Sequence, residues 1–175
     1  VALKQYDEAE KLAKEQSRRQ NDDPRYLVDI GELKKLQGDS AKADQQFDKA
    51  LKNLRPDQGS IRALANAFTQ NNELDYALAT YERGSKLLKN DATNFFYETA
   101  SIRAAKGDVA GMVSDYMDLL QSNPAYLQAV QNGLARLIDF TATDDRSDIL
   151  RTELLRRVQR DPDNTLFQEM LIWVY

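Results

Sequence analysis

The chain has 175 residues, and its 24 Lys and Arg against 28 Asp and Glu give a net charge of −4, so it lacks the basic surface of a general nucleic-acid binder. It contains neither cysteine nor histidine, which removes disulfides, thiolate metal sites and the commonest general base. We therefore expect no catalysis, no metal ion, no cofactor and no nucleic-acid partner. The sequence has no apolar run of the roughly 20 residues that a membrane span needs, and it leaves the compartment open.

Helix-forming residues dominate the whole chain. Glycine and proline are rare, at seven and four, and alternating β-branched residues are nearly absent, which predicts an all-α fold. In chain order, residues 1–5 are expected to be the tail of one helix and 6–20 a complete second helix. The next helices follow in pairs, with the dipeptides GD (38–39), NE (72–73) and GD (107–108) as the turns within pairs. Pro56, Pro124 and Pro162 end the second helix of a pair.

The helices recur at a nearly constant spacing. One column of residues is spaced by 34, 34 and 35, and a second lies four residues later on the same helical face: Ala9, Ala43, Ala77, Met112; Ala13, Phe47, Tyr81, Tyr116. Two further columns are spaced by 34, 35 and 34: Leu27, Ile61, Phe96, Val130; Gly31, Ala65, Ala100, Leu134. Their small members predict close helix approach, and their large members predict a core that successive pairs bury together.

This period and pattern resemble the tetratricopeptide repeat (TPR) family over essentially the whole chain. The resemblance implies a right-handed superhelical solenoid of antiparallel helix pairs. Two departures are Lys34 and Arg103, which occupy positions where the family carries an aromatic residue. The expected units are 1–20 (second helix of a partial repeat), 24–56, 58–90, 93–124, 125–162 (divergent, with a longer turn) and 163–175 (first helix of a truncated repeat).

The resemblance also implies a function. In this family the first helices line a concave groove that binds an extended peptide or a partner helix, so we expect a protein–protein interaction scaffold or adaptor. The matching positions here are Arg25, Val28, Glu32, Lys35, Arg62, Asn66, Thr69, Gln70, Asn94, Tyr97, Ser101, Ala104, Gln128, Gln131, Ala135 and Ile138. Many carry amides or hydroxyls, which can hydrogen-bond an extended backbone. Tyr97 is expected either to face this groove or to pack on a neighbouring helix, whereas Phe96 belongs to a core column.

Two other functions stay open. The chain could be a regulatory or assembly region of a larger protein whose catalytic domain lies elsewhere. It could also self-associate, because the apolar segment 166–175 would expose a sticky face and favour a homodimer through the terminal helices.

Two charged features have alternative interpretations. The stretch 146–160 carries a net charge of +3 and could dock acidic groups, or it could be a solvated helix with internal ion pairs. The acidic pairs 22–23 and 144–145 lack the spacing of a calcium loop, so they are expected to cap helices.

Overall fold

The computed structural model describes residues 2–88, 95–140 and 145–175. These residues form helices and connecting turns and contain no strand, which confirms the all-α prediction. The chain divides into two compact units, residues 1–93 and 94–175.

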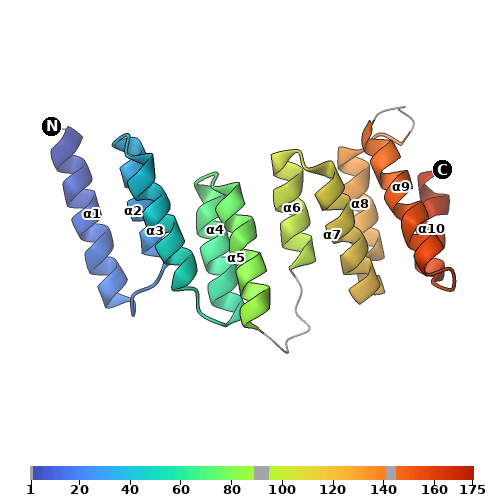
Figure 1. Ribbon diagram of the computed structural model, residues 1–175, viewed down its shortest axis with the longest axis horizontal. Coiled ribbons are helices and arrows are strands. Elements are labelled where there is room, and N and C mark those ends of the chain that lie inside the picture. Colours follow the sequence, from blue (N-terminus) through green and yellow to red (C-terminus); the bar gives the residue numbers. More distant parts are fainter. Residues whose placement is uncertain (1, 89–94, 141–144) are drawn as a thin grey trace. The chain divides into compact units, whose positions relative to one another are not determined.

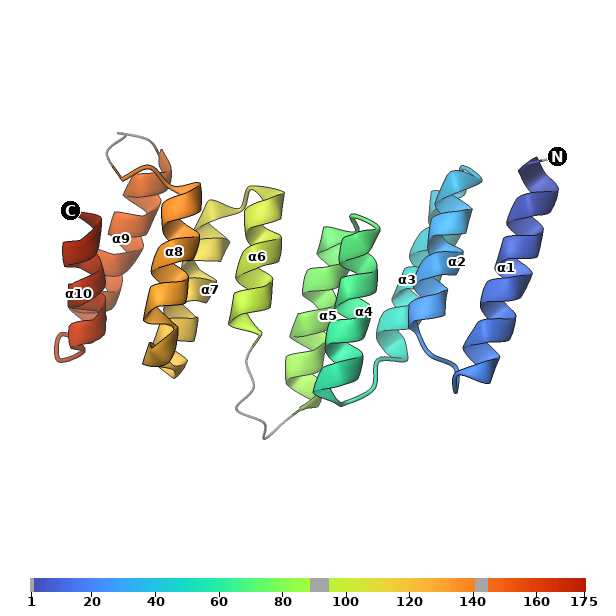
Figure 2. The same cartoon turned by 180° about the vertical axis from the view of Figure 1, so that it is seen from behind.

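Unit 1 contains five helices. They are α1 (Ala2–Arg19), α2 (Arg25–Leu36), α3 (Ser40–Lys52), α4 (Gln58–Gln70) and α5 (Leu74–Leu87). The helix α2 packs against α3, α4 packs against α5, and α1 packs against α2. Within this unit α3 and α5 lie on one side, and α2 and α4 lie on the other (Figures 1 and 2). The helix α1 continues without a break from Ala2, so the expected helix end near residue 5 is wrong.

Unit 2 contains a second series of helices. They are α6 (Phe96–Lys106), α7 (Val109–Ser122), the short 3-10 helix η1 (Pro124–Tyr126), α8 (Leu127–Leu137), α9 (Asp145–Arg160) and α10 (Thr165–Val174). The helices α6 and α7 form an antiparallel pair, and α9 packs against both α7 and α10.

The turns inside three pairs share one backbone shape. Gly38, Asn72 and Gly107 have φ values of 82°, 58° and 76°, in the left-handed region that ends many helices. The next residue, Asp39 or Asp108, caps the following helix, since its carboxylate accepts a hydrogen bond from a backbone N–H in the first turn. These turns explain why GD recurs between the paired helices.

The α4–α5 turn departs from this pattern in both residues. Asn72 carries a Cβ into the left-handed region, which costs free energy that glycine avoids. Glu73 makes no capping hydrogen bond, and its carboxylate accepts one from Lys35 Nζ of α2 instead. This turn therefore gives up local stability while it joins α5 to α2.

Replacing Asn72-Glu73 with Gly-Asp should stabilise unit 1 by about 1 kcal/mol. The gain combines a relaxed backbone and a restored helix cap, each worth about 1 kcal/mol. It exceeds the loss of the Lys35–Glu73 ion pair, which is worth up to about 1 kcal/mol. The measurement is the urea midpoint of the full chain by far-UV circular dichroism. The reverse exchange, Gly38-Asp39 to Asn-Glu, is the matched control and should destabilise by a similar amount. Equal midpoints for both exchanges would contradict this account of the turns.

The core of unit 1 is built around the small residues of the repeat columns. Ala43, Ala65 and Ala77 are fully buried. A Cβ added to Gly31 would lie 2.2 Å from Phe47 Cε1, so α2 and α3 approach too closely there for any side chain. The expected close helix approach is confirmed at these positions.

An aromatic cluster fills the space beside them. The Phe47 ring packs edge-on against Phe68 and Tyr76, with centroid distances of 5.5 and 5.0 Å, and Phe68 stacks on Tyr76 at 5.2 Å. Burial and the nearby Asp48 raise the pKa of Tyr76 to about 12. This cluster ties α3 and α4 to α5.

The core of unit 2 joins α7 to its neighbours. Met112, Tyr116 and Met117 of α7 are buried in one apolar cluster with residues of α6, α8, α9 and α10. Burial differs from expectation at the start of α6, where Phe95 is buried and Phe96, which packs against the cluster, is only half-buried. Phe95 precedes the first turn of α6, so its side chain does not follow the periodicity of that helix.

A buried arginine, Arg157, contacts residues of three helices in unit 2. Arg157 of α9 is 5 % exposed and pairs with Asp118 of α7 and Glu153 of α9, each at 2.7 Å. It also donates to Gln121 Oε1 at 3.1 Å and lies over the Phe167 ring of α10. One cation therefore connects three helices.

Lys34 and Arg103 show what replaces the aromatic residue expected at their positions. Lys34 Nζ lies 2.6 Å from Glu10 Oε2 of α1, and Arg103 Nε lies 2.9 Å from Asp115 Oδ2 of α7. The prediction allowed looser packing or packing by the alkyl stem at these positions. The structure adds an ion pair to a neighbouring helix in both cases.

Candidate functional site

In unit 1 the predicted groove residues lie on α2 and α4, which share one side of the unit (Figure 2). Asn66, Thr69 and Gln70 of α4 are exposed, and Arg62 is half-buried. The Thr69 hydroxyl donates to the backbone oxygen of Ala65, so its proton is used within its own helix. Asn66 and Gln70 therefore present the most accessible side-chain amides of this face.

The cations of the same face are held by nearby partners. The Arg25 guanidinium donates to both carboxylate oxygens of Asp23, with its closest contact at 2.6 Å. Lys35 pairs with Glu73. Arg62 donates to Gln58 Oε1 at 3.2 Å.

Glu32 is the one carboxyl group among the predicted groove residues of unit 1, and its pKa is raised. Burial raises the pKa of Glu32, and the carboxylate of Glu73 raises it further against the opposing effect of Lys35. Its Oε1 atom is buried and has no hydrogen-bond partner among the described residues. Glu32, Lys35 and Glu73 thus form a small charged group that connects α2 to the start of α5.

In unit 2 the predicted residues lie on α6 and α8. Tyr97 is 47 % exposed, and its ring centroid lies 6.4 Å from that of Tyr116, so it is both accessible and in contact with a neighbouring helix. Ser101 is exposed and Gln131 is half-buried. Gln128 is exposed and donates to Asn132 Oδ1.

Some of the sixteen predicted positions do not belong to an accessible face. Val28 and Ile138 are buried, because they point into the core of their units, so their assignment to a groove is wrong. Asn94 lies outside the described residues. Ala104 is half-buried and Ala135 is exposed.

The C-terminal helix is better covered than the sequence suggests. Phe167, Met170 and Val174 of α10 are buried, while Ile172 and Tyr175 are 77 % and 80 % exposed. The apolar face of 166–175 is therefore mostly used within unit 2, and the sticky surface is smaller than expected. The homodimer stays a prediction.

The arginines of the basic stretch 146–160 have partners both inside and outside the stretch. Arg156 pairs with Glu153 at 2.7 Å, Arg151 donates to the Phe140 carbonyl at 2.9 Å, and Arg146 donates to the Leu137 carbonyl at 3.1 Å. The Arg156–Glu153 pair agrees with the interpretation as a solvated helix with internal ion pairs, whereas the two carbonyl acceptors lie in the segment before α9.

The acidic pairs were expected to cap helices. Asp23 Oδ1 accepts from the Arg25 N–H at the start of α2, and residue 144 lies outside the described residues. The described part of the chain holds no group of three acidic side chains arranged to hold a metal ion.

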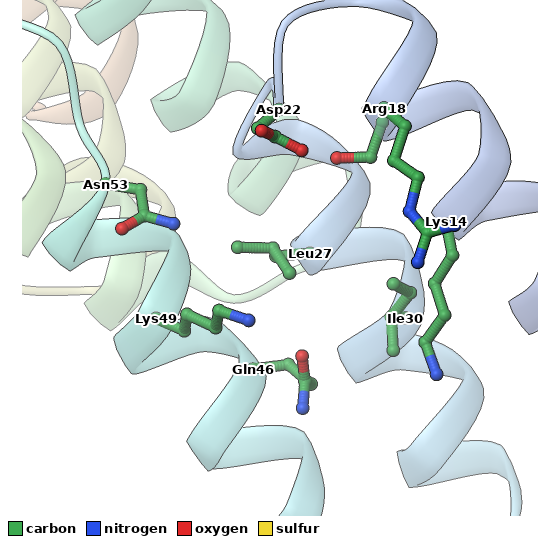
Figure 3. Close-up of a pocket in the computed structure, with 9 residues that line it drawn as sticks. Lys14, Arg18, Asp22, Leu27, Ile30, Gln46, Lys49 and Asn53 are labelled. Atoms are coloured by element: carbon green, nitrogen blue, oxygen red, sulfur yellow. The ribbon is translucent and has the colours of Figure 1, made fainter.

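One cavity was not anticipated from the sequence. It lies between α1, α2 and α3 and has a volume of about 470 Å³. Asp22 of the α1–α2 turn is one polar lining residue (Figure 3). The other polar residues lie on α1 and on α3 or directly after it: Lys14, Ser17, Arg18, Gln46, Lys49 and Asn53. These residues follow helical spacings of three, four and seven, which is the signal that could have revealed two facing polar stripes.

Comparisons of the chain with protein-family models and with curated proteins give no match. The TPR resemblance therefore depends on the residue columns and turns described above. None of the helices in the described ranges combines the length and apolar character needed to cross a bilayer.

Proposed function

We propose that the protein is a TPR-like right-handed solenoid that acts as a non-catalytic scaffold. Its first helices, α2, α4, α6 and α8, would bind an extended segment of a protein partner. The binding energy would come from hydrogen bonds to the partner backbone and from aromatic contact with Tyr97.

The recurrence of one helix pair supports the repeat assignment. The pairs α2–α3, α4–α5 and α6–α7 have similar lengths, and each is joined at a left-handed residue. Equivalent small residues, Ala43 and Ala77 in the second helices and Ala65 and Ala100 in the first, are fully buried. A regular pair of this kind is the unit from which helical repeat arrays are built.

The observation that supports the binding function is that the cations of the α2–α4 face are already paired, while its exposed side chains include uncharged amides. Arg25 and Lys35 are already paired within the chain, whereas Asn66 and Gln70 are exposed amides. Amides can both donate to and accept from a peptide backbone, and they do not demand a charged partner. The face is therefore suited to an extended, uncharged backbone more than to a charged tail.

The test uses peptides selected from a random library against the intact chain. The double variant Arg62→Glu, Tyr97→Ala should weaken their binding about tenfold or more, because it removes an aromatic anchor and places a new charge beside Asn66. Affinity is measured by fluorescence anisotropy, and circular dichroism verifies that each variant is folded.

The control is Lys86→Glu, an equal charge reversal on α5, which lies on the other side of unit 1. It should leave the affinity within about twofold, as expected for an exposed charge outside a contact surface. Unchanged binding by the folded double variant would overturn the groove assignment, as would an equal loss in the control.

A further inference from the structure

The cavity between α1, α2 and α3 differs in charge from the rest of the chain. Three cations and one carboxylate line it, whereas the whole chain carries a net charge of −4. It is lined by the second helix of one expected repeat and both helices of the next. Its polar walls come from α1 and α3 rather than from the α2–α4 face discussed above.

Its cations are incompletely neutralised. Arg18 and Lys49 form no ion pair with any described residue, and both lie along the cavity wall (Figure 3). Lys14 shares the single carboxylate of Glu10 with Lys34, at 2.7 and 2.6 Å. An anion placed here would gain charge-assisted hydrogen bonds without displacing an existing partner of Arg18 or Lys49.

The floor of the cavity is apolar. Leu27 and Ile30 of α2 project into the space between α1 and α3. Leu27 stands in a predicted core column, yet it is only half-buried. The volume of 470 Å³ lies in the range of small-molecule sites, which combine an apolar lining with a few convergent polar groups.

We propose that this cavity binds an amphipathic organic anion. Its carboxylate or phosphate head contacts Arg18 and Lys49, and its apolar body lies on Leu27 and Ile30. The amides of Gln46 and Asn53 supply further donors to the head.

The carboxylate of Asp22 places a negative charge at the cavity, which would repel a bound anion. Asp22 lies in the α1–α2 turn, where both Asn21 and Asp22 have left-handed backbone angles of 54° and 55°. Arg55 fixes this turn by donating to the Asn21 carbonyl. The Asp22 carboxylate would repel the head group and direct it toward the cations.

The probes are hexanoate and phenyl phosphate, titrated into the ¹⁵N-labelled full chain and followed by backbone chemical shifts. At least one should give saturable shifts centred on residues 14–30 and 46–53. Hexanamide, which lacks the charge, and inorganic phosphate, which lacks the apolar body, should bind at least about tenfold more weakly. The better of the two charged probes identifies the head group.

Matched variants separate this site from general attraction to surface charge. Arg18→Gln and Lys49→Gln should each weaken binding at least about fivefold. Their neighbours Arg19 and Lys52 are also exposed but do not line the cavity, so Arg19→Gln and Lys52→Gln should change binding less than about twofold. Asp22→Asn keeps a residue type that tolerates the left-handed backbone and should strengthen binding. Equal losses in pocket and control variants, unsaturable shifts spread over the surface, or equal binding of inorganic phosphate would each overturn the proposal.

Discussion

Arg157→Ala should lower the free energy of unfolding by about 3 kcal/mol, because it leaves partly buried partners without their cation. Glu153 and Gln121 lose a donor, Asp118 loses an ion pair at 2.7 Å, and the Phe167 ring loses a packed neighbour. Asp118 keeps some access to water, so the effect falls at the lower end for a broken buried pair. The measurement is the urea midpoint of the full chain, followed by circular dichroism.

The adjacent Arg156 is a matched control. It pairs with the same Glu153 at 2.7 Å, but its side chain is largely exposed. Arg156→Ala should therefore cost less than about 1 kcal/mol, as expected for a surface ion pair. If the two alanine variants unfold at the same urea concentration, Arg157 does not have the bridging role described here.

Gly31→Ala is the second change with a large expected effect. The new Cβ would lie 2.2 Å from the Phe47 ring, which is itself packed against Phe68 and Tyr76 and cannot move freely. Overpacking of this kind costs about 3 kcal/mol at its upper end, while alanine restores about 1 kcal/mol of helix propensity. We expect a net loss of about 2 kcal/mol in thermal or urea unfolding.

Replacing the Phe47 ring with a smaller side chain should restore part of the stability that Gly31→Ala loses. In the Gly31→Ala, Phe47→Leu double variant the smaller side chain leaves room for the Cβ. The combined cost should then be smaller than the sum of the two single costs by at least about 1 kcal/mol. Additive costs would show that the α2–α3 contact is not limited by this pair.

The parts of the fold that the sequence predicts are those with a short-range physical cause. Gly38 and Gly107 mark turns because only glycine enters the left-handed region without strain, and Asp39 and Asp108 follow because they cap a helix. The burial of Ala43 could also be predicted, since its spacing relative to the other repeats defines a common helical face.

Features that depend on three helices at once were missed. The stretch 146–160 was interpreted either as a site for docking acidic groups or as a solvated helix with internal ion pairs. Neither alternative predicted that Arg157 is buried and pairs with Asp118 of α7. Leu27 was expected in the core, but it borders a cavity whose walls belong to α1 and α3. In each case the deciding partner is distant in sequence, so helical spacing can show a polar stripe on one helix but not which helices face each other.

The helix α1 is attached to the rest of unit 1 with little buried surface. From Gln5 to Arg19 this helix has no buried side chain, and its contact with α2 includes the Glu10–Lys34 pair. Hydrogen bonds from Lys14 and Lys34 hold the pKa of Glu10 below its ordinary value, so this pair persists into mild acid. Elements with few buried contacts need the least free energy to unfold locally, so we expect α1 to be the first element of this unit to detach. A molecule that bridged Arg18 to Lys49 would raise the free energy of local unfolding of α1 by the free energy of its own binding. Amide hydrogen exchange in α1 would then become slower.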